Sequence, residues 1–309
     1  MTTTTATDIL HASSDVIIIG GSYSGLSAAM ALGRALRDVL IIDSGLPCNR
    51  QTPYSHNFVT QDGKPPQTIA DEAKAQVLQY HTVRLHNDLA TAATKTEGGF
   101  RVQTQSGQTF SAKKLLFATG VKDIMPAIPG FAESWGISAL HCPYCHGYEV
   151  RHQKTGVMCN GELGFDFARL IANWTGDLTL FTNGPSTLHA AQTARLAQLN
   201  IPVIETTISA LKHTNGYIKA LVLSDGNAIP LDALYARIAF EQHCALPVQL
   251  GCQLTEQGYL QVDNFQRTTI PGVFACGDNS SFMRAVSAAV ASGTMAGAMI
   301  NREMVDDRG

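Results

Sequence analysis

Two closely spaced cysteines form the most reactive candidate site in this sequence. They stand in the segment HCPYCHGYE, where Pro143 and Tyr144 separate Cys142 from Cys145 and His146 directly follows the second thiol. Two thiols at this spacing can close a small disulfide loop, and if Cys145 opens a helix, the helix dipole stabilises its thiolate and lowers its pKa. The imidazole of His146 can hold or deliver the proton that thiol–disulfide exchange requires near neutral pH.

The alternative for this cysteine pair is half of a zinc site, with His141 or His146 as a further ligand. Structural zinc takes four ligands, and the sequence has no second CxxC and no HxxxH pattern. The CPYC motif also occurs in glutaredoxin-like proteins, but those are small single domains with the motif near their start. The chain has seven cysteines, and the remaining ones are scattered at Cys48, Cys159, Cys244, Cys252 and Cys276. We therefore predict redox chemistry at one pair, no metal site and no disulfide scaffold.

A glycine-rich turn between two apolar runs indicates a nucleotide-binding element. Residues 15–20 read DVIIIG and residues 39–43 read VLIID, and both runs are typical of strands that are buried on two faces of a parallel sheet. Between them lie the turn GGSYSG and a stretch of small and apolar residues at helical spacing. This order of strand, turn, helix and strand predicts a βαβ unit.

The turn residues meet the demands of a dinucleotide site. Gly20 permits a sharp turn, Ser22 replaces the second glycine of GxGxxG but is small enough for close approach, and Gly25 lets the helix pack on the strand. The N-terminus of the helix then offers N–H groups to a pyrophosphate. Asp43, at the end of the second strand, is placed to accept hydrogen bonds from a ribose.

A second βαβ pattern begins at TGVMCN, after the CPYC segment. The two βαβ patterns predict two doubly wound domains, with boundaries near residues 120 and 240.

Composition limits the class of protein. The 309-residue chain carries 22 Lys and Arg against 25 Asp and Glu, so its net charge of −3 gives no footprint for nucleic acid or an acidic membrane surface. A hydrophobic fraction of 45% supports a sizeable core, and no apolar run is long enough to predict a transmembrane helix. The N-terminal segment MTTTTATDILHASSD lacks the basic start and apolar centre of a secretory signal, so we expect a short lead-in and a cytoplasmic protein.

Four motifs occur in a characteristic order along the chain. They are GGSYSG with Asp43, ATG at 118–120, CPYCHG, and GVFACGD at 272–278 followed by Arg284-Ala285-Val286. Together they resemble, over essentially the whole chain, the thioredoxin reductase class of FAD-dependent disulfide oxidoreductases.

The resemblance implies an α/β fold of two Rossmann-like, doubly wound, three-layer domains, with the second inserted into the first. It implies a discontinuous FAD-binding domain at residues 1–120 and 241–309. The insertion at 121–240 would be an NADPH-domain-like unit that carries the CxxC motif.

The resemblance also implies roles for individual residues. Cys145 would be the thiol nearest the flavin and Cys142 the thiol that exchanges with substrate. Asp278 would bind the ribityl or phosphate groups, and Arg284–Val286 would lie along the isoalloxazine edge. The residues expected at FAD are Gly20, Ser22, Tyr23, Ser24, Gly25, Asp43, Ser44, Arg50, Asn57, Ala118, Thr119, Gly120, Gly277, Asp278, Arg284, Ala285 and Val286.

The cysteine motif departs from the usual reductase of this class, which has an aspartate after the second cysteine. The form CPYCHGYE looks more like two side branches. One comprises dithiol oxidases of disulfide-containing natural products, which pass electrons to oxygen. The other comprises thioredoxin reductase-like flavoproteins that do not depend on pyridine nucleotides.

The second glycine-rich turn, CNGELG, is degraded. Cys159 replaces the first glycine, at a cost of about 1 kcal/mol or more if φ must be positive there, and Glu162 places a carboxylate where a pyrophosphate would approach. The segment Thr182–Ser186 lacks the arginines that pair with the 2′-phosphate of NADPH, and the nearest one, Arg195, lies well down the next helix. We therefore expect inefficient use of NADPH, with the inserted domain retained mainly as a platform for the cysteines.

The resemblance implies an enzyme in which FAD exchanges two electrons with the Cys142–Cys145 pair and the pair exchanges them with an external dithiol or disulfide. In one direction it would reduce a thioredoxin-like protein from a donor other than NADPH. In the other it would oxidise a small dithiol and pass the electrons to oxygen. We favour the first direction, because nothing in the sequence marks a small-molecule pocket.

Three other functions stay open from the sequence. They are an NADPH-dependent thioredoxin reductase that tolerates the divergent turn, a redox sensor that exchanges stoichiometrically, and a zinc-containing NAD-binding module. Because members of the class form homodimers through their FAD domains, the resemblance also implies a homodimer.

Overall fold

The structure is a computed structural model that describes residues 13–307. Of the predicted lead-in at 1–15, residues 1–12 lie outside the described residues, whereas Ser14 and Asp15 belong to a strand. The chain forms two compact units. The first takes in residues up to Arg50, Pro66–Lys122 and the chain from Glu241 onward. The second consists of Gln51–Pro65 and Asp123–Phe240, so residues 51–65 pack with the second unit, whereas the sequence-based division placed them in the first.

The first unit is built on one seven-stranded sheet. Its parallel strands are β3 (Val83–Asn87), β2 (Val39–Asp43), β1 (Ser14–Ile19), β6 (Thr109–Phe117) and β17 (Val273–Ala275). They lie in the order β3-β2-β1-β6, and β17 pairs with the C-terminal part of β6. The antiparallel strands β5 (Gly99–Thr104) and β4 (Ala90–Thr96) continue the sheet from the N-terminal part of β6.

Alternate side chains of β1 enter two different cores. Val16 and Ile18 pack among the helices of the unit, whereas Ile17 and Ile19 pack on the opposite face in a cluster that includes Leu246. Because successive strand residues point to opposite faces, this uninterrupted apolar run is buried on both sides. The sheet therefore has a covered layer on each face.

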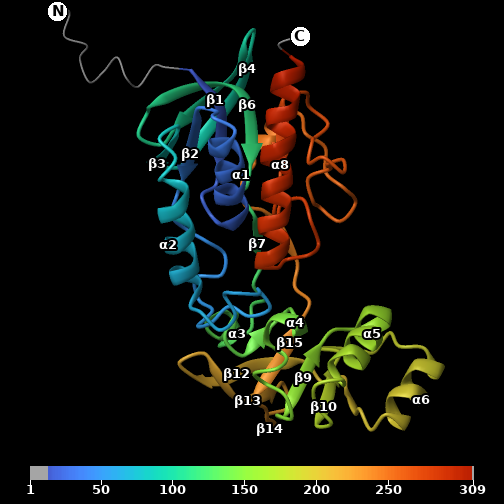
Figure 1. Ribbon diagram of the computed structural model, residues 1–309. Coiled ribbons are helices and arrows are strands. Elements are labelled where there is room, and N and C mark those ends of the chain that lie inside the picture. The colour runs from blue at the N-terminus through green and yellow to red at the C-terminus, as the bar shows by residue number, and fades with distance from the viewer. Residues whose placement is uncertain (1–12, 308–309) are drawn as a thin grey trace, which may run out of the picture. The chain divides into compact units, whose positions relative to one another are not determined.

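Two helices far apart in the sequence cover one face of this sheet. Figure 1 shows α1 (Tyr23–Arg34) beside α8 (Val286–Asp306), the red helix that leads to the C-terminus. The Ser27 hydroxyl donates to the carbonyl of Val290 at 2.7 Å, across 263 residues of sequence. A Cβ on Gly293 would lie 2.1 Å from the carbonyl oxygen of Ser24, so only glycine permits this close approach. The other helices of the unit are α2 (Pro66–Val77) and α7 (Leu246–Gln249).

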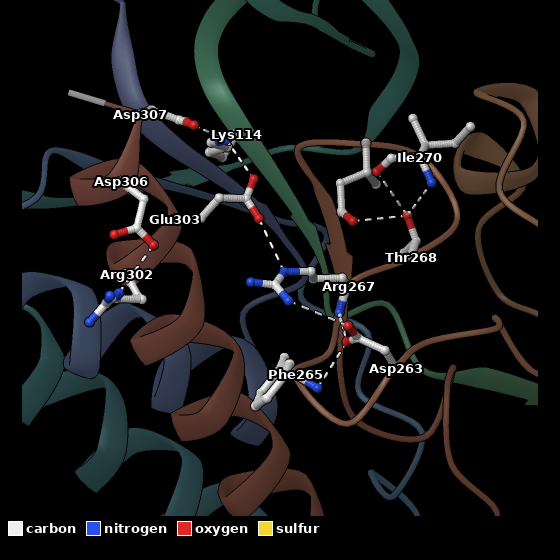
Figure 2. Close-up of polar contacts among 11 residues, drawn as sticks. Lys114, Asp263, Phe265, Arg267, Thr268, Ile270, Arg302, Glu303, Asp306 and Asp307 are labelled. Atoms are coloured by element: carbon white, nitrogen blue, oxygen red, sulfur yellow. Dashed lines mark hydrogen bonds and ion pairs between the residues drawn. The ribbon is translucent and has the colours of Figure 1, made fainter. Parts of the chain in front are cut away.

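A charged network fixes the C-terminal end of α8 to the sheet (Figure 2). The ammonium of Lys114 on β6 donates to Glu303 at 2.6 Å and pairs with Asp307 at 2.8 Å. Glu303 also accepts a hydrogen bond from Arg267 at 3.2 Å. Burial alone lowers the pKa of Lys114, but its hydrogen bonds to Asp307 and Glu303 outweigh burial and leave the pKa raised.

Replacing Lys114 with methionine is expected to lower the free energy of unfolding by about 2 kcal/mol, because Glu303 and Asp307 lose their partner next to a side chain that is only 11% exposed. Since the folded-state pKa of Lys114 is raised, its contribution is present below the ordinary value of 10.5 and is lost only above it. The deficit, measured by urea unfolding, should therefore be constant between about pH 6 and 9. Lys113→Met is the control, because that side chain is 56% exposed and its pair with Asp15 contributes about 0.5 kcal/mol or less; equal losses in both variants would contradict the prediction.

The second unit contains a five-stranded parallel sheet and a three-stranded antiparallel sheet. The parallel order is β11 (Val203–Ile204), β10 (Leu178–Phe181), β9 (Thr155–Met158), β15 (Ala233–Ala236) and β8 (Ala139–Leu140). The antiparallel strands are β12 (Ile208–Thr214), β13 (Tyr217–Leu223) and β14 (Ala228–Pro230). Its helices are α3 (Phe131–Ser134), α4 (Pro143–His146), α5 (Gly161–Ile171) and α6 (Ala190–Gln198).

The parallel sheet of the second unit is also buried on both faces. Val157 packs against Phe167 and other residues of the helical layer, and Met158 packs in the cluster that holds Leu211 and Leu221 of the antiparallel sheet. The chain passes between the units at β7 (Val121–Asp123) and β16 (Phe240–Gln242), which pair with each other. The predicted α/β class, with two Rossmann-like domains and the second inserted into the first, is confirmed.

Candidate functional site

The two cysteines of CPYC are joined by a disulfide within the second unit. Cys142 is the N-cap of the short helix α4, and its sulfur accepts the N–H of Cys145 at 3.2 Å. The residue at the start of this helix is therefore Cys142 and not Cys145, so the condition under which the helix dipole would act on Cys145 is not met. Pro143 occupies the first helical position, since its fixed φ and missing N–H suit that place, and this makes the preceding cysteine the cap. The N–H of Cys145 stabilises negative charge on Cys142 when the disulfide is reduced.

His146 is the last residue of α4 and is half-buried. Burial, and secondly the charge of His56, lower the pKa of His146 to about 4. Its imidazole is therefore neutral at physiological pH, because burial disfavours the protonated form. Of the two predicted roles, holding a proton or delivering one, this environment disfavours the first.

Aromatic rings lie on both sides of the cysteine motif. Tyr144, in the motif itself, is exposed and meets Trp174 edge-on, with ring centroids 5.6 Å apart. Trp135 is 8% exposed, stacks on Phe131 and lies 5.9 Å from the ring of His141. Trp135 thus belongs to the core, whereas Tyr144 remains at the surface.

The first glycine-rich turn joins β1 to α1 in the first unit. Gly20 has φ of +107°, and a Cβ there would lie 2.3 Å from the carbonyl oxygen of Ala118. A Cβ on Gly25 would lie 1.9 Å from the carbonyl oxygen of Gly20. Ser22 is the N-cap of α1 but makes no side-chain capping hydrogen bond, so the first-turn N–H groups are available to an external acceptor.

Several predicted residues meet at one edge of the first sheet. Register pairs Ile19 with both Ile42 and Phe117, and Phe117 with Ala275, so β1, β2, β6 and β17 end together. Ligands bind at such carboxyl ends in sheets of this kind. The predicted residues that directly follow these ends or lie in the adjoining turns are Gly20, Ser22, Tyr23, Ser24, Gly25, Asp43, Ser44, Ala118, Thr119, Gly120, Gly277 and Asp278.

Some of these side chains already have structural roles. Asp43 accepts the N–H of Gly21 at 3.0 Å, which fixes its carboxylate against the turn. Tyr23 is buried, and its hydroxyl donates to the carbonyl of Pro66 at 3.0 Å. Ser24 donates to the carbonyl of Cys276 at 3.5 Å.

The C-terminal motif contributes a charged pair and the start of α8. Arg284 Nε lies 3.8 Å from Asp278 Oδ2, and both side chains are largely buried. Ala285 is the N-cap of α8, and Val286, its first residue, packs against the cluster that contains Tyr23.

Sequence reasoning missed Asn279, which is fully buried beside Asp278. Its Nδ2 donates to the carbonyl of Phe117 at 2.9 Å and to the hydroxyl of Thr119 at 3.4 Å, so it ties the ATG motif to the GVFACGD motif. Its Oδ1 is buried and has no hydrogen-bond partner within residues 13–307. The only signal in the sequence was its position directly after the motif.

The two predicted loop residues belong to different units. Arg50, in the first unit, is exposed, and its guanidinium donates to the carbonyl of Pro47 at 3.2 Å. Asn57, with φ of +61°, belongs to the second unit, and its N–H donates to Asp62 at 2.8 Å. The other residues predicted at FAD belong to the first unit.

The first unit fits FAD by three observations. The glycine turn packs backbone on backbone more closely than a Cβ would allow, the N-terminus of α1 is uncapped, and the orphaned Oδ1 of Asn279 lies where β6 and β17 end. A pyrophosphate would accept N–H groups of α1, and a ribose would meet Asp43.

The second glycine-rich turn is closed by its own side chains. Asn160 caps α5: its Oδ1 accepts the N–H groups of Gly161 at 2.8 Å and Thr187 at 3.0 Å, and its Nδ2 donates to Pro185 at 2.9 Å. Glu162 lies in the first turn of α5, where its charge takes the place of an external anion. The condition for strain at Cys159, a positive φ, is not met, because the positive φ of this turn, +60°, is at Gly161.

Four of the other five cysteines are poor candidates for exchange. Burial raises the pKa of Cys276 to about 12, against a smaller lowering by the hydroxyl of Ser24. Burial also raises the pKa of Cys159, Cys244 and Cys252, while Cys48 is exposed. Thiols with raised pKa react slowly near neutral pH.

Residues 13–307 contain no cluster of three or more His, Cys, Asp or Glu side chains arranged to hold a metal ion. No helix in that range is both long and apolar enough to cross a membrane.

Comparison with known proteins gives consistent matches. The family model described as "Pyridine nucleotide-disulphide oxidoreductase" matches residues 14–293. "Thioredoxin reductase tcpT" of Claviceps purpurea is 33% identical over 306 residues and covers 95% of both chains. "Thioredoxin reductase sirT" of Leptosphaeria maculans is 28% identical, with 93% of each chain covered. The crystal structure of an oxidoreductase from Agrobacterium tumefaciens superposes with a TM-score of 0.90 at 37% identity, covering 96% of this chain and 99% of the other.

Proposed function

This chain belongs to the pyridine nucleotide-disulphide oxidoreductase family, and within it we propose that Cys142 and Cys145 are the reactive pair of a thioredoxin reductase-like thiol–disulfide oxidoreductase. As an FAD-dependent disulfide oxidoreductase, it requires a flavin site, which we assign to the first unit. FAD, when bound there, supplies two-electron chemistry. The observation that carries the proposal is the Cys142–Cys145 disulfide, capped by the N–H of Cys145 and followed by a neutral His146.

The residues of the pair have distinct tasks in the reduction of an external disulfide. The thiolate of Cys142 attacks one substrate sulfur, the substrate S–S bond breaks, and a mixed disulfide forms. Cys145 then gives its proton to neutral His146 and attacks the sulfur of Cys142, which releases the second substrate sulfur as a thiolate. His146 passes that proton to the departing thiolate, and the other substrate thiolate takes up a proton from solvent, which balances the proton that Cys142 lost when it ionised. Oxidation of a dithiol is the same sequence in reverse.

We propose a thioredoxin-like protein as the disulfide partner. Two curated relatives are named thioredoxin reductases, and the exposed ring of Tyr144 beside the disulfide offers a contact for a protein surface. Anaerobic photoreduction of the bound flavin, followed by addition of oxidised thioredoxin, tests this. We expect the flavin absorbance near about 450 nm to return within seconds, and failure with every protein and small disulfide would remove the proposal.

We also propose that NADPH is a poor electron donor for this chain. The side chain of Asn160 accepts the N–H groups of Gly161 and Thr187 at this turn, and Glu162 in the first turn of α5 repels an approaching anion. An efficient donor would bleach the flavin within about a second, since typical kcat values are about 1–10³ s⁻¹. Stopped-flow mixing with about 0.1 mM NADPH is expected to leave most of the flavin oxidised after about a minute. Rapid bleaching would overturn this part of the proposal.

The same closed turn favours a second candidate function. A chain without a nicotinamide donor can receive its electrons from a small dithiol and pass them to oxygen. Oxygen uptake that depends on an added dithiol and on Cys142 would support this oxidase, whereas electron transfer from the photoreduced flavin to thioredoxin alone would support the reductase.

We further propose that the first unit mediates a homodimer, as the family resemblance implies. Light scattering coupled to size-exclusion chromatography measures this directly. A mass close to the 33.1 kDa of one chain would contradict it.

A further inference from the structure

Trp174 lies beside the disulfide motif, within the second unit. Its ring meets that of Tyr144 edge-on, with the centroids 5.6 Å apart. A Cβ on Gly147 would lie 2.7 Å from Nε1 of Trp174, so the indole packs against the backbone at the C-terminal end of α4. The missing side chain of Gly147 is what permits this approach. Trp174 therefore contacts α4 at two places, the ring of Tyr144 and the backbone of Gly147.

The backbone around Trp174 also binds the segment that follows α4. The carbonyl of Trp174 accepts the N–H of His152 at 2.9 Å. The hydroxyl of the next residue, Thr175, donates to the carbonyl of Gln153 at 2.8 Å. The same short loop thus supports the cysteine motif and the chain that leads away from it.

Trp174 is itself anchored by α5, the helix that it follows. Its N–H donates to the carbonyl of Ile171 at 2.9 Å, which continues the last turn of that helix. Phe167 and Ile171 on α5 are 3% and 0% exposed and pack in the core of the second unit. Because these side chains are held in the core, the indole has a fixed base from which to support α4.

The helix that carries the cysteines is too short to be stable without such support. α4 has four residues and forms a single turn, and helices of this length are marginal without tertiary contacts. In the oxidised protein the disulfide closes the turn covalently. Reduction removes that link, and the N–H of Cys145 then reaches the sulfur of Cys142 only while the turn persists. The reduced pair therefore depends on the packing of α4.

We propose that Trp174 is a positioning residue for this site: its indole keeps the turn of α4 formed after the Cys142–Cys145 bond is reduced, so that the N–H of Cys145 continues to stabilise the thiolate of Cys142. The inference rests on the proposed function, because it concerns the same cysteine pair. A stabilised thiolate is present at lower pH, so more of it is available to attack a substrate disulfide near neutral pH. Trp174 thus sets how reactive the pair is in the reduced protein.

The test measures how fast Cys142 is alkylated as a function of pH. The reduced holoprotein is treated anaerobically with iodoacetamide between about pH 4 and pH 10, and tandem mass spectrometry gives the fraction alkylated at Cys142. The thiolate displaces iodide to form a thioether, so the rate follows the ionised fraction of the thiol. In the wild type we expect half of the maximal rate at a pH below about 8.5, the ordinary value for a free thiol.

Variants of the two rings test whether the aromatic contact is responsible. Trp174→Leu is expected to raise the pH of half-maximal rate by about one unit and to slow alkylation near pH 7 about fivefold or more, with the same maximal rate at high pH. Trp174→Phe retains a ring opposite Tyr144 and should restore the wild-type profile. Tyr144→Leu should raise the pH of half-maximal rate by about half a unit, with no further rise when it is combined with Trp174→Leu.

Phe167→Leu is the matched control for a general loss of stability. Phe167 lies in the core of the same unit, where its ring meets that of Tyr235 edge-on with the centroids 6.0 Å apart. Because the variant removes a buried ring, its thermal midpoint should fall at least as far as that of Trp174→Leu. Its alkylation profile should match that of the wild type.

The outcomes separate the two proposals. An unchanged profile in Trp174→Leu, an equal shift in Trp174→Phe or Phe167→Leu, or a wild-type profile centred at or above about pH 8.5 would overturn the role of Trp174 alone. A wild-type pair that does not re-form its disulfide in oxidised glutathione would overturn the proposed function itself. If Trp174→Leu fails to fold, the profile of Tyr144→Leu decides the question, because the side chain of Tyr144 is exposed.

Discussion

Replacing Cys145 with serine is expected to lower the rate of turnover with any disulfide or dithiol substrate by about 10³-fold or more, because serine provides neither a thiolate nor a disulfide partner for Cys142. The loss has a chemical origin, so the fold should persist. The N–H of residue 145 still donates to Cys142, and the glycine turn assigned to FAD lies in the other unit. The purified variant should therefore keep its flavin spectrum.

The measurement is steady-state turnover together with the flavin absorbance of the same sample. Cys48→Ser is the matched control, since this cysteine is exposed, lies in the first unit and has no assigned role in exchange. Its turnover should stay within about twofold of the wild type. Retention of more than about a tenth of the activity in Cys145→Ser would show that another thiol performs the exchange.

Replacing Gly25 with alanine is expected to remove bound FAD and to destabilise the first unit by about 3 kcal/mol or more. The added Cβ would lie 1.9 Å from the carbonyl oxygen of Gly20, and both atoms belong to the backbone. No side chain can move aside to make room, so the turn and the start of α1 must shift. The N–H groups that would bind a pyrophosphate shift with them.

The flavin-to-protein absorbance ratio and the thermal midpoint of the apoprotein test this prediction. Gly98→Ala is the control, because a Cβ there meets nothing within 4 Å and the glycine has an ordinary φ. It should change stability by less than about 0.5 kcal/mol and leave the flavin content unchanged. A Gly25→Ala protein with a full complement of FAD would show that the cofactor is bound elsewhere.

The features of the fold that sequence predicts well are those that local pattern determines. The run DVIIIG is apolar at every position of the strand, so only a sheet covered on both faces buries it, and β1 is such a strand. The two cysteines of the disulfide are only three residues apart in the sequence, so their pairing is also determined locally. The sequence leaves the start of α4 open, and Pro143 determines it, because its fixed φ and missing N–H suit the first helical position and make Cys142 the cap.

Long-range contacts determine what the sequence did not reveal. Residues 51–65 follow β2 in the chain and so were placed with the first domain, but His56 faces Glu149 and a Cβ on Gly136 would meet Thr52. Asn160 likewise reads as a neutral residue in a degraded motif, and only the fold brings Pro185 and Thr187 within its reach. Side chains that serve several distant backbone groups leave no periodic signal in the sequence.

The packing of α8 on α1 has a consequence for synthesis of the chain. Ser27 bonds to Val290 across 263 residues, and the whole second unit lies between these two helices in the sequence. During translation, the surface of α1 that accepts Gly293 stays uncovered until the last helix leaves the ribosome. The inserted unit can complete its own core before then, whereas the first unit, to which we assign the FAD site, can complete its core only once α8 has been synthesised.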